Sequence, residues 1–199
     1  MLRKYIPLPA TAVERDVTFH EPSQSLPDRV TLDSHAVDCM TDLRQVTAVI
    51  GRGDETIDVA NERMKRRGVR LLLVADESRR VKGVISAADV LGERPMQIVQ
   101  SRGIKRADVL IRDVMTTQEE LHVLQMEDVR LAKVGHIVAT LKAAGRQHAV
   151  VVDLDEQGRQ KVRGIFSASQ IARQLGVVIQ TTEVARTFAE VEAMLARAT

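Results

Sequence analysis

The order of apolar and polar residues predicts a series of short helices and strands along the chain. In the stretch ETIDVANERMKRRG the apolar side chains of Ile57, Ala60 and Met64 recur at helical spacing, with charged residues opposite. Gly68 closes this pattern, which predicts a helix that ends there. The apolar run LLLVAD suits a buried strand, and VKGVIS predicts a second strand that leads into a short helix.

The same order of elements recurs in the second part of the chain. It predicts a helix over about residues 127–145, then the strand HAVVVD, the strand KVRGIFS and a last helix in SQIARQLG. The repeated stretches lie 75 residues apart for DCMT and DVMT (38 to 113) and 81 apart for GVISAAD and GIFSASQ (83 to 164). The second copy has four more residues between Asp153 and Gly164 than the first has between Asp76 and Gly83. We expect them to form a longer hairpin turn.

This ordered recurrence resembles a tandem pair of cystathionine-β-synthase-type (CBS) domains, often called a Bateman module. The resemblance covers about residues 36–176 and is carried by DCMT and DVMT, the helix start DETI, the strand ends VAD and VVD, and the two segments G-h-h-S-x-x-D/Q, where h is apolar. It implies an α/β fold of two helix–strand–strand–helix units, each with a lead-in strand, packed with pseudo-two-fold symmetry.

The pattern and the resemblance together divide the chain into five parts. These are an irregular, proline-containing N-terminal arm at 1–35, a first unit at 36–95, a linker at 96–110, a second unit at 111–176 and a C-terminal helix at 177–199. In that last helix Val184, Phe188, Val191 and Leu195 share one face. We expect this face to pack on its own module, with a dimer seam as the alternative.

Composition and charge narrow the classes of function. The net charge is 29 − 27 = +2, and one tyrosine, three phenylalanines and no tryptophan leave few platforms for base stacking, so nucleic-acid binding is not expected. Cys39 is the single cysteine, and its apolar neighbours predict a core residue rather than a nucleophile. No apolar run has the length of a signal peptide or a membrane span, which favours a cytoplasmic protein without a membrane partner.

Known catalytic and metal-binding patterns do not occur in the sequence. No two of the five histidines lie four residues apart, and C-x-x-C, the phosphate-binding loop and the nucleophile elbow are missing. We therefore expect no enzyme activity, no metal and no required cofactor.

The segment SAAD, from Ser86 to Asp89, has two interpretations. A serine at a helix start with an acid three residues later forms a capping box, and Ser167 with Gln170 could do the same. A capped helix start can also bind phosphate, while a carboxylate in its first turn accepts hydrogen bonds from ribose hydroxyls. The resemblance implies this second use, with the serine near a phosphate and the aspartate on the ribose of an adenosine nucleotide.

We expect a main nucleotide site in the first unit and a weaker one in the second. The first comprises Ser86, Asp89, Arg70, Gly83, Val84, Val46, Thr47 and Val49, and the second comprises Ser167, Gln170, His148 and Arg146. Because a hydrogen bond to a neutral amide contributes less than one to a carboxylate, the site with Gln170 should bind roughly tenfold more weakly. For Arg70 a solvated surface side chain, and for His148 a structural role, remain alternatives.

The function expected from these residues and from the resemblance is a stand-alone regulatory module. It would bind AMP, ADP, ATP or S-adenosylmethionine and signal by a conformational change to a separate, unknown partner protein, as a homodimer. The alternative is a ligand-free scaffold for protein association.

Overall fold

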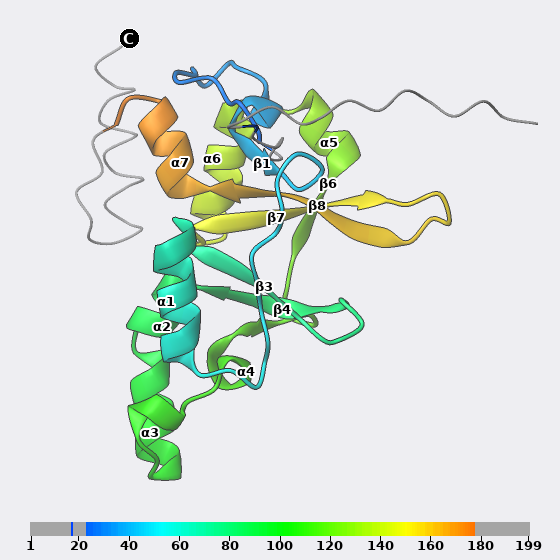
Figure 1. Cartoon of the computed structure of the whole chain (residues 1–199). Coiled ribbons are helices and arrows are strands. Elements are labelled where there is room, and N and C mark those ends of the chain that lie inside the picture. The colour runs from blue at the N-terminus through cyan, green and yellow to red at the C-terminus, as the bar shows by residue number, and fades with distance from the viewer. Residues whose placement is uncertain (1–16, 18–22, 178–199) are drawn as a thin grey trace, which may run out of the picture.

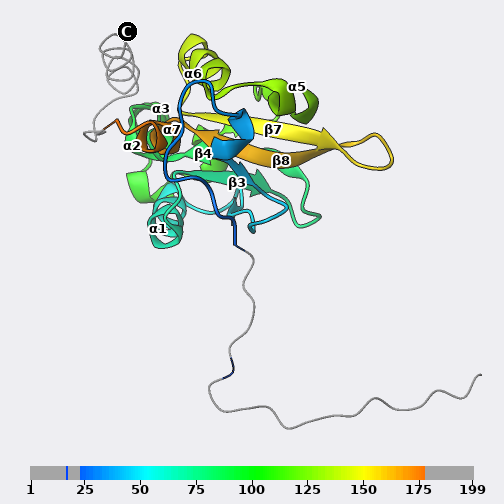
Figure 2. The ribbon, with the colours of Figure 1, turned by 90° about the horizontal axis from the view of Figure 1, so that it is seen from above.

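The computed structural model describes residue 17 and residues 23–177. Most of the predicted N-terminal arm and the C-terminal apolar face with Phe188 lie outside the described residues. Two four-stranded sheets lie one above the other, with helices on their outer sides and both hairpins pointing in the same direction (Figure 1). The second hairpin extends beyond the other described residues in this view and in the view from above (Figure 2).

The first sheet has the strand order β2-β3-β4-β5. Its strands are β2 (Ile50–Gly51), β3 (Leu71–Ala75), β4 (Val81–Ser86) and β5 (Thr116–Thr117). The helices of this part are α1 (Ile57–Arg67), α2 (Ala87–Leu91), α3 (Arg94–Arg102), the 3-10 turn η2 (Arg106–Asp108) and α4 (Ile111–Val114). The segment expected as a linker, 96–110, therefore contains most of α3 and all of η2.

The second sheet has the strand order β1-β8-β7-β6. Its strands are β1 (Met40–Asp42), β6 (Val123–Gln125), β7 (His148–Leu154) and β8 (Gln160–Ser167). Its helices are the 3-10 turn η1 (Ala36–Cys39), α5 (Met126–Leu131), α6 (Val134–Ala143) and α7 (Ala168–Gln174). The α/β fold with two repeated units is confirmed.

The two units exchange their lead-in strands. β1 lies at the start of the first unit but pairs antiparallel with β8 of the second, with Thr41 opposite Ile165. In the same way β5 lies near the start of the second unit and pairs with β4 of the first, with Thr116 opposite Val84. Each sheet is therefore completed by the other unit.

Local sequence signals explain where α1 begins and ends. The Thr56 hydroxyl accepts a hydrogen bond from the Val59 amide, and Gly68 adopts the left-handed conformation at φ 63° that closes the helix. The helix expected over residues 127–145 is instead two helices, α5 and α6. The break falls at Ala132 and Lys133, whose extended backbone ends α5 and begins α6.

The prediction of a longer second hairpin turn is wrong. Five residues join the strands in both hairpins, 76–80 in the first and 155–159 in the second. The four additional residues lengthen the strands, because β7 and β8 hold 7 and 8 residues and β3 and β4 hold 5 and 6. The second hairpin projects for this reason.

Three apolar layers hold the molecule together. One lies between the helices and the first sheet, around Leu72 and Ile85, and another lies between the helices and the second sheet, around Val151 and Phe166. A third joins the two sheets, with Leu73 of β3 and Val150 of β7 in one cluster. Cys39 is fully buried, and burial raises the pKa of its thiol to about 12, which agrees with a core residue.

Candidate functional site

The segment from Ser86 to Asp89 forms a capping box where β4 enters α2. Asp89 Oδ2 accepts hydrogen bonds from the Ser86 amide at 2.8 Å and from the Ser86 hydroxyl at 2.7 Å. The Asp89 amide in turn donates to Ser86 Oγ at 3.3 Å. The other carboxylate oxygen, Oδ1, accepts no hydrogen bond from the described residues. One oxygen thus holds the helix start while the second is available to a ligand.

The second unit does not repeat this cap, so the interpretation of Ser167 and Gln170 as a second capping box is wrong. Ser167 accepts no hydrogen bond from the backbone of α7, and its hydroxyl lies 2.9 Å from that of Ser169. Gln170, in the place of Asp89, makes no hydrogen bond with any described residue. The two units therefore differ in more than the charge of this side chain.

The residues around Ser86 come from β3, from β4 and from the segment just before β2. Val84 lies opposite Leu73 and Ser86 opposite Leu71, and since directly opposed side chains share a face, Ser86 lies on the face that packs between the sheets. Val49 accepts a hydrogen bond from the Leu73 amide at 3.1 Å and so lies along the same sheet.

The remaining predicted residues of the lead-in and of β3 are more peripheral. Thr47 is exposed and Val46 is half-buried, with its amide bonded to the Asp42 carbonyl in a turn at 3.0 Å. The Arg70 carbonyl accepts a hydrogen bond from the Ala87 amide at 2.9 Å, which places this residue at the start of α2. The Arg70 side chain is exposed and makes no ion pair with a described residue.

Gly83 has a structural reason to be glycine. A Cβ atom there would lie 2.2 Å from the carbonyl oxygen of Thr116 on the exchanged strand β5, and its φ is 156°. Gly164 of the second unit is also approached by the exchanged strand β1, but chiefly by the side chain of Met40, whose sulfur would lie 2.6 Å from a Cβ atom. The glycine of the repeated motif thus accommodates the strand from the other unit.

His148 and Arg70 lie close together although they belong to different units. His148 begins β7 opposite Ser167, on the face that also carries Val150. Burial and the nearby Arg70 guanidinium lower the pKa of His148 to about 4, so its imidazole is neutral at neutral pH. Arg146 points elsewhere, since its guanidinium donates to the carbonyl of Glu120 at 3.4 Å.

Two surface cavities lie at the turns of the hairpins rather than at these residues. The first, the loop cavity of about 510 Å³, is lined by Arg52, Gly53, Asp54, Val74, Ala75, Asp76, Glu77, Ser78, Lys82, Arg112 and Met115. The second, the hairpin cavity of about 540 Å³, is lined by Leu43, Arg44, Asp153, Leu154, Asp155, Glu156, Gln157, Arg159, Lys161, Val162 and Arg163. None of the predicted site residues lines either cavity.

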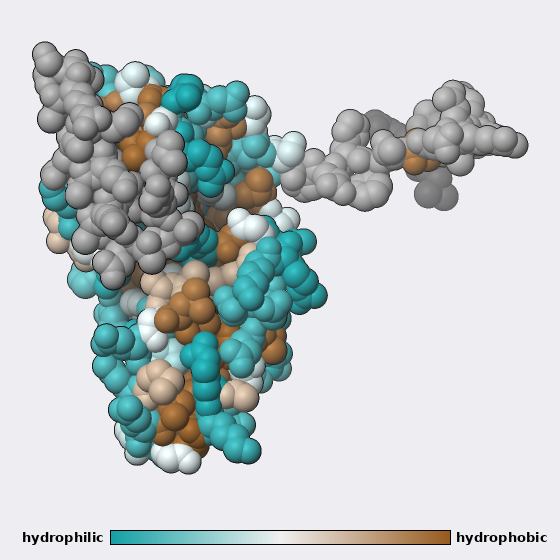
Figure 3. Space-filling view, turned by 90° about the vertical axis from the view of Figure 1, so that its left-hand side faces the viewer, coloured by the Kyte–Doolittle hydropathy of each residue, from teal (hydrophilic) through white to brown (hydrophobic). Residues whose placement is uncertain are grey.

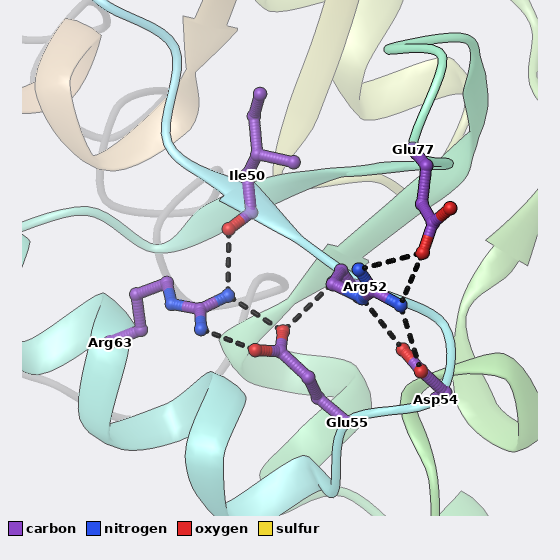
Figure 4. A network of polar contacts seen from close by, with 6 residues as sticks. All are labelled: Ile50, Arg52, Asp54, Glu55, Arg63 and Glu77. Carbon is purple, nitrogen blue, oxygen red and sulfur yellow. Dashed lines mark hydrogen bonds and ion pairs between the residues drawn. The ribbon is translucent and has the colours of Figure 1, made fainter.

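The loop cavity is bordered by an ion-pair network at the entry to α1 (Figure 4). Arg52 pairs with Asp54 at 3.1 Å and with Glu77 at 3.4 Å, while Arg63 donates to Glu55 and to the carbonyl of Ile50. Because these cations are matched by carboxylates, the loop cavity has no excess of either charge that would select a ligand.

A buried ion pair between Asp42 and Arg163 was not expected from any sequence pattern. Asp42 Oδ2 lies 2.6 Å from Arg163 Nη2, and their side chains are 8 and 14% exposed. This hydrogen bond lowers the pKa of Asp42 to about 2. Arg163 also reaches Asp153 of β7 at 3.3 Å, so the pair fastens β1 to both central strands of the second sheet. The sequence shows a cation before the motif glycine in both units, at Lys82 and Arg163, but nothing in it indicates Asp42 as the partner.

Within the described residues no cluster of three or more potential metal ligands occurs. None of the helices in that part of the chain has the length and the apolar run that crossing a bilayer requires.

Comparison with known proteins supports the assignment of the fold. The family model of the CBS domain matches residues 35–95. No curated protein matches the chain. Among solved structures, an uncharacterized conserved protein from Pyrococcus horikoshii is 18% identical with a TM-score of 0.53, and the match covers 77% of this chain and 100% of that one.

Two further solved structures carry the family name. A CBS-domain-containing protein from Agrobacterium tumefaciens is 17% identical with a TM-score of 0.52, over 72% of this chain and 94% of that one. The CBS-pair protein CBSX2 from Arabidopsis thaliana, which has been solved with AMP, is 21% identical with a TM-score of 0.47, over 70% of this chain and 94% of that one. The family model thus identifies one CBS domain at residues 35–95, and the two interlocked units together have the fold of a CBS-domain pair.

Proposed function

We propose that this chain is a regulatory module that binds an adenosine nucleotide beside Ser86 and Asp89 of the first unit. The observation that carries the proposal is the state of the Asp89 carboxylate. Its Oδ2 is used by the capping box, whereas Oδ1 accepts no hydrogen bond from the described residues. A carboxylate held by its own helix and open on one side can accept hydrogen bonds from ribose hydroxyls without giving up its structural role.

The second unit supports binding at one main site rather than two. Gln170 is neutral, and Ser167 is turned toward Ser169 instead of capping its helix. Arg70, which directly precedes the first unit's β3 and has no described ion-pair partner, would contact the phosphate. The candidate ligands are AMP, ADP, ATP and S-adenosylmethionine.

The regulatory step would be a change in how the two units are arranged. Each sheet contains a strand of the other unit, so a ligand that favours one arrangement at β4 would shift β5 and, through it, the second unit. The signal would pass to a separate partner protein.

Titration calorimetry of the full chain with AMP, ATP and S-adenosylmethionine tests the site. We expect about one ligand per chain, and a loss of about tenfold or more in affinity for Asp89→Asn, whose amide oxygen can still cap the helix. The matched control is Gln170→Ala in the second unit, which should leave the main site unchanged. Unaltered binding by Asp89→Asn would contradict the proposed site, and no binding of any ligand would contradict the proposed function.

A ligand-free scaffold for protein association is the second candidate. It is favoured by one observation, that the residues of the expected nucleotide site line neither the loop cavity nor the hairpin cavity. A scaffold would bind none of the three ligands in the calorimetric experiment.

Either function is compatible with a homodimer formed through the helical side of the first unit. Val59 of α1, Leu91 of α2 and Met96 of α3 are all exposed. Figure 3 shows apolar side chains in brown on the side of the molecule where these helices lie, between polar ones in teal. Light scattering of the purified chain measures whether it forms this dimer.

A further inference from the structure

The projecting second hairpin has a strand edge that nothing in the described structure covers. β1 pairs with β8 only at residues 164–166, and one further hydrogen bond joins the Leu43 amide to the Arg163 carbonyl. Residues 160–162 pair with β7 on their other side, but no described strand lies beside them on the side of β1. In an antiparallel sheet every second residue of an edge strand points its amide N–H and its carbonyl away from the neighbouring strand. This edge of β8 therefore offers backbone donors and acceptors that no described strand uses.

The first hairpin lacks such an edge because its strands are shorter. β5 pairs with Gly83 and Val84, and the Gln118 amide donates to the Lys82 carbonyl, so that at the hairpin end of β4 only Val81 is left uncovered. The open edge therefore results from the four residues that lengthen β7 and β8, and it has no equivalent in the repeat.

The hairpin cavity, which has both apolar side chains and exposed cations in its lining, adjoins this edge. The hairpin cavity of about 540 Å³ includes Leu43, Val162 and Leu154, and Leu154 is 56% exposed. The side chains of Arg44, Arg159 and Lys161 are 66–69% exposed, whereas their carboxylate partners Asp153 and Asp155 are 23 and 11% exposed. Although Glu156 at the turn is also exposed, an approaching chain meets three cations before it meets the covered carboxylates.

We propose that residues 160–162 of β8 and the hairpin cavity bind an extended acidic segment of a partner protein as an added strand. The backbone of the segment would pair with the open edge, and its aliphatic side chains would lie against Leu154 and Val162. Its carboxylates would meet Arg44, Arg159 and Lys161. Strand addition of this kind draws affinity from backbone hydrogen bonds and specificity from alternate side chains.

The charges decide against a second copy of this chain as the occupant. Two copies joined edge to edge at β8 would bring Arg159 and Lys161 of one chain against the same cations of the other, and opposed like charges destabilise strand pairing. An acidic segment instead gains from each of these cations.

The test uses the full chain and a fluorescent nonapeptide in which glutamate and valine alternate. We expect saturable binding by anisotropy that weakens with salt, together with slower amide hydrogen exchange at residues 160–162. A peptide with lysine for glutamate, and one with two central prolines that cannot add as a strand, should not bind.

Matched variants of the two hairpins locate the binding. Lys161→Glu should lower the affinity for the acidic peptide by about tenfold or more, because it replaces an attraction to the peptide carboxylates by a repulsion at the rim of the hairpin cavity. Its control is Arg80→Glu, the charge reversal at the corresponding position of the first hairpin, which should leave the affinity within about twofold. Leu154→Ser should also weaken binding, without any change of charge that could unsettle the hairpin.

Several results would overturn the proposal. These are no binding of the acidic peptide, equal binding of the proline-containing peptide, or equal losses in Lys161→Glu and Arg80→Glu. A change in the molecular mass of the free protein caused by Lys161→Glu would make a second copy the occupant. Nucleotide binding, measured separately by calorimetry, does not depend on any of these residues, so failure of this proposal leaves the proposed nucleotide site unaffected.

Discussion

His148 is a titratable residue in a position that the first unit gives to an aliphatic side chain. It lies opposite Ser167 as Leu71 lies opposite Ser86, and both face the layer between the sheets. The pKa of His148 is about 4 in the folded chain against an ordinary value of 6.5. The folded chain therefore excludes a proton that the unfolded chain binds between these two pH values.

The wild-type chain should therefore lose stability in mild acid, and His148→Leu should abolish this loss. As the pH falls from 6.5 to 4, the free energy of unfolding of the wild type should decrease by up to about 3 kcal/mol relative to that of the variant. Each unit of difference between the two pKa values corresponds to about 1.4 kcal/mol. Urea unfolding of both proteins at several pH values in this range measures the difference. His122→Gln, at an exposed histidine, is the control, and identical pH profiles for the wild type and His148→Leu would contradict the assignment.

At the scale of elements, the exchange of lead-in strands depends on two glycines that tolerate close backbone contact. We expect Gly83→Ala to destabilise the chain more than Gly164→Ala. The new Cβ would meet the Thr116 carbonyl oxygen at 2.2 Å in the first case, and in the second chiefly the flexible Met40 side chain, at 2.6 Å. Overpacking of this kind costs about 1–3 kcal/mol when the neighbour can adjust.

Denaturant unfolding of the two variants measures which substitution lowers the free energy of unfolding more. Gly68→Ala is the control for backbone conformation, because its φ is 63° but no atom lies within 4 Å of the new Cβ, so it should cost about 1 kcal/mol. If Gly83→Ala cost no more than Gly68→Ala, the contact with β5 would not be the reason for this glycine.

The sequence predicted the elements well and their pairing poorly, for a physical reason. Helix α1, the strands β3 and β4 and the cap of α2 follow from periodicity and capping residues, which act over a few positions. The exchange of β1 and β5 depends on contacts between residues more than 30 positions apart, such as Thr41 with Ile165, and no local pattern encodes them. The break between α5 and α6 was missed because the apolar positions on both sides fit one helical period.

The same limit applied to the candidate site. Ser86 and Asp89 could be found because a motif three residues apart suffices for a cap. Asp42 and Arg163 could not, since they are 121 residues apart and become partners only through strand exchange. For the lengthened hairpin the four additional residues were counted correctly, but the spacing of Asp153 and Gly164 does not distinguish a longer turn from longer strands.

At the scale of the whole molecule, the exchange makes each unit incomplete without the other. The sheet of the first unit requires β5, and the sheet of the second requires β1, which the Asp42–Arg163 ion pair fastens to β8. A layer that includes Leu73 and Val150 joins the two sheets as well. The described part of the chain should therefore unfold as one cooperative unit, even though its sequence is a tandem repeat.

Asp42→Asn tests this coupling from one side of the molecule. The substitution removes the nearer of the two carboxylates that pair with the nearly buried Arg163 and leaves it only Asp153, at 3.3 Å. Loss of one partner of a buried pair costs up to about 3–5 kcal/mol. If the units are coupled, hydrogen exchange in increasing denaturant should become faster by the same factor at Val151 of the second sheet and at Leu72 of the first, although Asp42 pairs only with the second. Faster exchange at Val151 with unchanged protection at Leu72 would show two independent units, and a ligand bound at Asp89 would then have no route through β5 to the second unit.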